Sequence, residues 1–200
     1  MGKVKSATIF RQFIEDVFTS DYDYRVKVNA IYACRSFDYH WIPLEVVKLI
    51  NDENVQVAIA ASEYLSSKGG LASELFYAHS KKAENWRVKT NLLKAALKDG
   101  YAGNAVSKVK TMYEESESVY EKGALLVAIG GHVTEMKFLG AELLQEENVV
   151  LKSYAMEALV TMRRSHGFDK AQAKYNKSNS GINHAHGFNI ILESAIETGD

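Results

Sequence analysis

One short sequence pattern recurs five times in the first 165 residues of the chain. In each copy a small polar residue (Asp, Asn or Ser) precedes an apolar segment, and alanine or leucine residues recur at fixed positions within that segment. The copies lie 30 to 33 residues apart, a period typical of proteins built from stacked pairs of helices. The residues that directly follow the small polar one are Tyr24, Val55, Trp86, Val119 and Val149.

Each copy has the sequence features of a helix with defined ends. Asp, Asn and Ser side chains accept hydrogen bonds from the free N–H groups of a first helical turn, and acidic residues nearby interact favourably with the helix dipole. Gly69, Gly100 and Gly167 lie just past the far ends of three copies, where glycine commonly ends a helix. We therefore expect helices that begin near the five residues named above.

A second amphipathic segment precedes each copy, and Pro43 in one of them suits a first helical turn. Neither helix can bury its apolar side alone, so neighbouring pairs must stack. The sequence thus predicts an all-α fold: a right-handed α-α superhelix (solenoid) of about five to six helical hairpin repeats, with about eleven or twelve helices. The apolar residues of the preceding segments are Ile9, Phe10, Phe13, Ile14, Val17 and Phe18; Leu44, Val47 and Ile50; Leu71, Leu75 and Phe76; Val106, Val109 and Met112; and Met136, Leu139, Leu143 and Leu144.

The five repeats occupy residues 1–165, which form the expected repeat domain. Residues 166–181 are polar and poorly periodic, and a helical pattern then resumes through Ile190, Ile191, Ala195 and Ile196. We expect residues 166–200 to be a degenerate sixth repeat, a cap or a truncated continuation, because the terminal repeats of a solenoid are atypical.

The repeat pattern resembles the HEAT repeat, an armadillo-like helical repeat, and its bacterial relatives. A polar cap, then Val, a basic residue and Ala along the second helix carry the resemblance, which covers roughly residues 6–165. Asn replaces the family's usual Asp in three of the five caps, and Lys replaces its usual Arg. The segment DYRVKVNAIYACRSFDYHW also resembles HEAT segments found beside cyclophilin-type prolyl isomerase domains in some bacterial proteins. The matching positions are Asn54-Val57-Ala61, Asn85-Val88-Lys89 and Asn148-Leu151-Lys152-Ala155.

Two sides of the second helices differ in composition. With successive residues about 100° apart, Val26, Ala30, Ala33 and Phe37 share a side that is apolar in nearly every copy and is the expected core. The opposite side changes from copy to copy, as a binding surface on a repeated scaffold would, although a merely solvated face would look the same. For a protein or peptide partner, the candidate binding residues are Arg25, Asn29, Tyr32, Arg87, Asn91, Lys94, Tyr120 and Tyr154.

A lysine occupies the edge of the apolar side in four copies. Basic residues at this position of HEAT repeats pair with the cap of the adjacent repeat, so the resemblance implies a structural ladder of ion pairs. Phosphate binding is the alternative, but a formal net charge of −1 provides no overall field that would attract nucleic acid. The four residues are Lys27, Lys89, Lys122 and Lys152.

No constellation of catalytic or metal-binding residues is recognisable. His184 and His186 could share a metal ion only in an extended segment, and nothing nearby completes a site. No phosphate-binding glycine loop, nucleophile elbow or HExxH motif is present. We therefore expect no catalytic residue, metal site or cofactor. The single cysteine, Cys34, is an expected core residue, since other copies fill its position with Leu65, Ala96, Ile129 and Leu159.

These features lead to the hypothesis of a non-catalytic protein–protein interaction scaffold whose partner binds the second helices. We expect no nucleic acid or membrane partner, because the net charge is near zero and no apolar run approaches the ~20 residues that span a bilayer. The start of the sequence lacks signal-peptide features, so the cytoplasm is the expected location. Two alternatives stay open: a HEAT-like DNA-binding or base-repair enzyme, and an accessory segment of a larger prolyl isomerase-containing protein.

Overall fold

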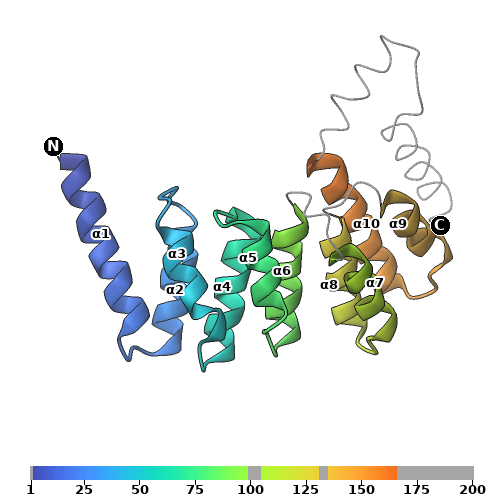
Figure 1. The fold of residues 1–200 in the computed structure, drawn as a ribbon, viewed down its shortest axis with the longest axis horizontal. Helices are drawn as coiled ribbons and strands as arrows, with labels where there is room; N and C mark the ends of the chain where they lie inside the picture. The colour runs from blue at the N-terminus through green and yellow to red at the C-terminus, as the bar shows by residue number, and fades with distance from the viewer. Residues whose placement is uncertain (1, 99–104, 131–134, 166–200) are drawn as a thin grey trace, which may run out of the picture. The chain divides into compact units, whose positions relative to one another are not determined.

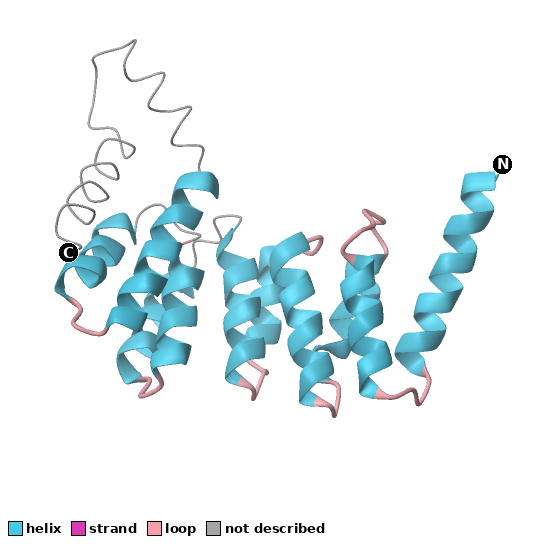
Figure 2. Ribbon diagram, turned by 180° about the vertical axis from the view of Figure 1, so that it is seen from behind, coloured by secondary structure: helices cyan, strands magenta, loops and turns pink. Residues whose placement is uncertain are grey.

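The computed structural model describes residues 2–98, 105–130 and 135–165, and within these ranges the protein is all-α. The described residues form ten α-helices and one short 3-10 helix, and they contain no strand (Figure 2). None of the described helices is both long enough and apolar enough to cross a bilayer.

The chain divides into two compact units, residues 1–95 and 96–200, and the division falls near the end of one helix. Figure 1 labels the helices in chain order. Those of the first unit are α1 (Gly2–Thr19), α2 (Tyr24–Cys34), α3 (Ile42–Val46), the 3-10 helix η1 (Val47–Asn51), α4 (Val55–Lys68), α5 (Ser73–Ser80) and α6 (Trp86–Lys98), whose last residues pass the division. Those described in the second are α7 (Ala105–Glu115), α8 (Val119–Ile129), α9 (Met136–Gln145) and α10 (Val149–Ser165).

All five predicted second helices begin at the predicted residues: α2, α4, α6, α8 and α10. The predicted caps bring this about, because each cap side chain accepts a hydrogen bond from a backbone N–H group of the first turn. Such a cap typically contributes ~1 kcal/mol. The cap-to-donor distances are 2.9 Å for Asp23–Arg25, 3.0 Å for Asn54–Gln56, 2.9 Å for Asn85–Arg87, 3.3 Å for Ser118–Glu121 and 2.9 Å for Asn148–Val150.

One of the three predicted glycine stops lies in the described part of the chain. Gly69 ends α4 with φ 68°, a left-handed conformation that favours glycine, and its N–H group donates to the carbonyl oxygen of Leu65 at 2.8 Å. Gly100 and Gly167 lie outside the described residues. The predicted helix stop at Gly69 is therefore confirmed.

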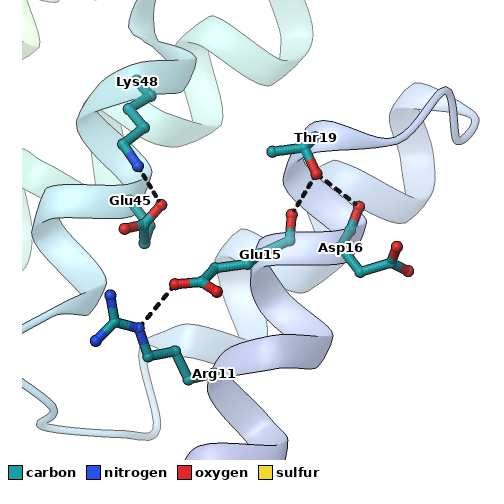
Figure 3. Close-up of polar contacts among 6 residues, drawn as sticks. All are labelled: Arg11, Glu15, Asp16, Thr19, Glu45 and Lys48. Atoms are coloured by element: carbon teal, nitrogen blue, oxygen red, sulfur yellow. Dashed lines mark hydrogen bonds and ion pairs between the residues drawn. The ribbon is translucent and has the colours of Figure 1, made fainter.

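The first helices are more varied than the second. Polar side chains of α1 bind partners within the same helix. Arg11 pairs with Glu15 at 2.7 Å, and the Thr19 hydroxyl donates to the carbonyl oxygen of Glu15 at 2.8 Å (Figure 3). The segment that follows Pro43 does not form one continuous α-helix, since it passes from α3 into η1. Lys48 of η1 pairs with Glu45 of α3 at 2.5 Å and links the two pieces (Figure 3).

One position in the second helices is completely buried in every copy. The residues there have an exposed fraction of 0%, and Cys34 is among them, as predicted. Burial raises the pKa of the Cys34 thiol to about 11, so this thiol stays protonated and behaves as an apolar core group. The five residues are Cys34, Leu65, Ala96, Ile129 and Leu159.

The predicted core side of α2 is wrong in part. Val26 is 42% exposed, Phe37 is 38% exposed, and Ala33 is also exposed, whereas Ile31 and Cys34 are buried. In α4 the equivalent residue Val57 is fully buried, because α2 packs against α4. Within the described residues no second helix precedes α2, so the same side has no equivalent helix to cover it.

An aromatic cluster replaces regular helix packing at the end of α2. The ring centroid of Phe37 lies 4.4 Å from that of Phe10 in α1, and Phe37, Tyr39 and Trp41 stack in succession at 6.0 and 5.9 Å. The guanidinium of Arg11 lies 5.6 Å from the centre of the Trp41 ring. These contacts hold the loop between α2 and α3 against α1.

Candidate interaction surface

The face of the second helices that varies between copies is largely accessible, but two of its positions are not. Ala60 in α4 and Val127 in α8 occupy repeat positions of this face and are buried. Among the eight candidate binding residues, Arg25, Asn29, Tyr32, Arg87 and Tyr120 are exposed. Asn91, Lys94 and Tyr154 are half-buried.

Tyr32 belongs to a network that joins α2 to α4. Its hydroxyl donates to Oε2 of Glu63 at 3.3 Å, and Nη2 of Arg35 lies 3.6 Å from the same oxygen. The guanidinium of Arg35 also lies 4.7 Å from the centre of the Tyr32 ring. Partial burial, followed by the charge of Glu63, raises the pKa of Tyr32. The ring is thus held in place while 41% of the residue stays exposed.

Arg25 is tied to the cap of its own helix. Its side chain donates two hydrogen bonds to the carboxylate of Asp23, at 2.9 and 3.1 Å, while the same carboxylate caps α2. The side-chain hydrogen bond from Arg25 lowers the pKa of Asp23 to about 2. The positive charge of Arg25 is therefore already matched within the protein.

Asn91 links α6 to α4. Its Nδ2 group donates to Oγ of Ser62 at 3.0 Å, and Ser62 is completely buried. Ser62 in turn donates to the carbonyl oxygen of Ile59 at 2.8 Å, so both polar groups have partners. This arrangement gives Asn91 a structural role beside its place on the variable face.

Arg87 and Lys94 of α6 differ from Arg25, the third charged candidate. No ion pair involves either residue in the ranges 2–98, 105–130 and 135–165. Arg87 lies over the Trp86 ring at 5.3 Å, a contact that leaves its hydrogen-bond donors available. These two side chains therefore present cationic charge that the described part of the protein does not neutralise.

The face of the second unit carries aromatic and apolar residues together with the exposed Glu157 of α10. Tyr120 of α8 is 63% exposed and Val150 of α10 is also exposed. Tyr154 packs against Gly123 of α8, since a Cβ atom placed on Gly123 would lie 2.1 Å from Cδ2 of Tyr154. Tyr154 is thus partly a packing residue, and only Tyr120 of the two tyrosines is free of such a role.

Among the described residues the predicted ladder of lysine–cap ion pairs is not seen, because Lys27 pairs with a carboxylate beside the cap and not with the cap Asn54. Nζ of Lys27 lies 3.5 Å from Oδ2 of Asp52, two residues before the cap Asn54 of the next copy, and both side chains are largely buried. Lys122 instead lies 5.3 Å from the centre of the Tyr113 ring. The position therefore serves local packing in these two copies, by different contacts.

Among the described residues, four hydrogen bonds connect residues separated by about one repeat, and sequence reasoning missed all of them. The separations are 29 to 31 residues. The bond from Tyr113 to Glu142, together with burial as the larger cause, raises the pKa of Tyr113. Complementary side chains at the repeat period were the available signal. The pairs are Tyr32–Glu63, Lys68–Asp38, Asn91–Ser62 and Tyr113–Glu142.

Two hollows lie in the first unit beside the turns that precede second helices. One of about 340 Å³ is bordered by Asp52, Glu53 and Glu84, and one of about 240 Å³ is bordered by Asp21 and again by Asp52. Asp52 already binds Lys27 and accepts from the N–H group of Asn54 at 2.9 Å. Both hollows lie at the helix starts and not on the candidate face.

The described residues contain no group of three or more His, Cys, Asp or Glu side chains that could hold a metal ion. His184 and His186 lie outside the described ranges. Comparisons with known protein families, curated proteins and solved structures give no match for this chain.

Proposed function

We propose that the protein is a non-catalytic interaction scaffold, built as a HEAT-like solenoid, that binds a protein or peptide partner on its second helices. The observation that carries this proposal is the contrast between two sides of the same helices. One position is fully buried in all five copies, whereas the opposite face changes from Tyr32 through Arg87 and Lys94 to Tyr120. A constant core beneath a variable surface is the arrangement that solenoid proteins use for recognition.

The hydrogen bonds between residues one repeat apart support the solenoid part of the proposal. Tyr32–Glu63 and Asn91–Ser62 join consecutive second helices within the first unit, at 3.3 and 3.0 Å. Bonds of this kind form when each helix pair stacks on the next in the same register. The exposed aromatic and arginine residues on this face belong to the types that dominate interface energetics.

The test compares two triple variants as baits for proteins in a cell extract, with retained proteins identified by mass spectrometry. The face variant is Tyr32→Ala, Arg87→Ala and Tyr120→Ala, which leaves the packing residue Tyr154 intact. The control variant is Tyr22→Ala, Lys48→Ala and Leu144→Ala, three exposed residues outside this face. We expect the face variant to lose a protein that the wild type and the control both retain, while circular dichroism shows the same helical content in all three. A protein retained equally by all three baits, or none retained specifically by the wild type, would contradict the proposal.

A further inference from the structure

α6 is the most one-sidedly charged helix of the interaction face. It contains Arg87, Lys89, Lys94 and Lys98 and no acidic residue, in a protein whose formal net charge is −1. Arg87 and Lys94 are seven residues apart and share one side of the helix, with Asn91 between them. We call Arg87, Asn91 and Lys94 the α6 stripe.

The carboxylates of the neighbouring helices do not neutralise this stripe. Glu63 is the acidic residue of α4 on the same face, and it is bound by Arg35 and Tyr32. Asp23, at the start of α2, is bound by Arg25. Arg87 and Lys94 form no ion pair with any described residue, as the site geometry showed. The described protein thus leaves two cations of the face without counter-charges.

We infer that the α6 stripe binds an acidic segment of a partner protein, an inference that rests on the proposed scaffold function. The two cations lie about 10 Å apart along the helix axis, from seven residues at ~1.5 Å each. Carboxylates three residues apart in a polyproline II segment have nearly the same spacing, at ~3.1 Å per residue, and they lie on one side because this helix has three residues per turn. The half-buried Trp86 ring beneath Arg87 adds an apolar contact for the peptide backbone or an apolar side chain.

Charge complementarity favours an acidic peptide over nucleic acid. A nucleic-acid footprint requires a row of phosphate contacts, typically from six or more basic groups, and the affinity is correspondingly steep in salt. Elsewhere on this face in the first unit, Arg25 pairs with Asp23 and Glu63 pairs with Arg35. Two unmatched cations fit two carboxylates and leave most phosphates of a duplex without a partner.

The test uses fluorescence anisotropy with a labelled, Glu-rich peptide whose carboxylates are three residues apart, and a matched peptide with Gln in place of Glu. The variant Arg87→Gln with Lys94→Gln is compared with the control Lys48→Gln with Lys137→Gln, which removes the same charge from first helices. We expect the wild type and the control to bind the Glu peptide alike and the α6 variant to bind at least about fivefold more weakly. The Gln peptide should not bind, and added salt should weaken the Glu complex.

Three outcomes would overturn the inference. The wild type could fail to bind the Glu peptide, or the α6 variant and the control could bind it equally. A random-sequence DNA duplex could bind the wild type more tightly than the peptide and depend on the same two residues, which would make the stripe a nucleic-acid site.

The inference and the proposed function fail in distinguishable ways. If a partner retained from extract is lost with Tyr32→Ala and Tyr120→Ala but kept with Arg87→Gln and Lys94→Gln, the scaffold stands and the acidic ligand does not. If no variant of the second helices affects retention, the scaffold proposal itself fails.

Discussion

The leucines of this chain range from completely buried to half exposed. Leu92 of α6 and Leu125 of α8 occupy the same repeat position and are both completely buried. Leu44 of α3 and Leu144 of α9 are leucines of similar helical context that are 50% and 47% exposed. The chain therefore contains a matched set in which the residue type is constant and only the surroundings differ.

We expect Leu92→Ala and Leu125→Ala each to lower the free energy of unfolding by ~2–5 kcal/mol, because each leaves a cavity among packed helices. Leu44→Ala and Leu144→Ala should lower it far less, near the surface norm of ~0.5 kcal/mol. Urea titrations of the four variants measure the differences. Equal losses at buried and exposed leucines would mean that the assigned core is wrong.

α8 and α10 pack closely at two glycines, Gly123 within α8 and Gly130 at its C-terminal end. A Cβ atom on Gly123 would lie 2.1 Å from the Tyr154 ring, and one on Gly130 would lie 2.5 Å from the carbonyl oxygen of Ala158. Neither glycine has a positive φ. The contact therefore requires the absence of a side chain and not an unusual backbone conformation. Substitutions at Gly123 and Tyr154 should therefore have coupled effects on the free energy of unfolding.

Gly123→Ala should lower the free energy of unfolding by ~1–3 kcal/mol, because the new methyl group collides with the Tyr154 ring. The same substitution in a Tyr154→Ala background should stabilise the protein by up to ~1 kcal/mol, since the ring is gone and alanine favours helix over glycine. A double-mutant cycle from urea unfolding measures this coupling. An equal effect of Gly123→Ala in both backgrounds would show that the two residues do not touch.

At the scale of the whole molecule, the main packing partners are near neighbours in the chain. In the first unit α2 packs on α4, and α4 packs on α3 and η1. In the second, α10 packs on α8 and α9, and α7 packs on α8. Proteins of nearest-neighbour contacts unfold in local steps, because each repeat depends chiefly on the adjacent ones.

Hydrogen exchange should therefore respond locally to core substitutions. Ile31→Ala removes a completely buried side chain of α2 and should speed amide exchange in α2 and α4 while α8 and α10 keep wild-type rates. Leu125→Ala should do the reverse, with faster exchange in α8 and α10. Mass spectrometry of peptides from these helices reads both effects. Uniform acceleration along the chain with either variant would show one cooperative unit instead.

Sequence alone determined where the second helices begin, because caps such as Asn54 and Asn148 act on N–H groups only two or three residues away. It also determined the buried position of Cys34 and its equivalents, since the helical period places them on the apolar side. These are local properties that each helix carries in its own residues. The all-α character of the described residues follows directly from them.

Only the tertiary structure decided which apolar sides are covered and which polar residues are free. Val26 is open and Val57 buried although both occupy one repeat position, because burial depends on the helix next to them and not on their own sequence. The sequence predicts Asn91 and Tyr154 as surface residues. In the structure Asn91 donates a hydrogen bond to Ser62 of α4, and Tyr154 packs against Gly123 of α8. The distance and rotation between helices set these contacts, and no pattern within a single helix contains that information.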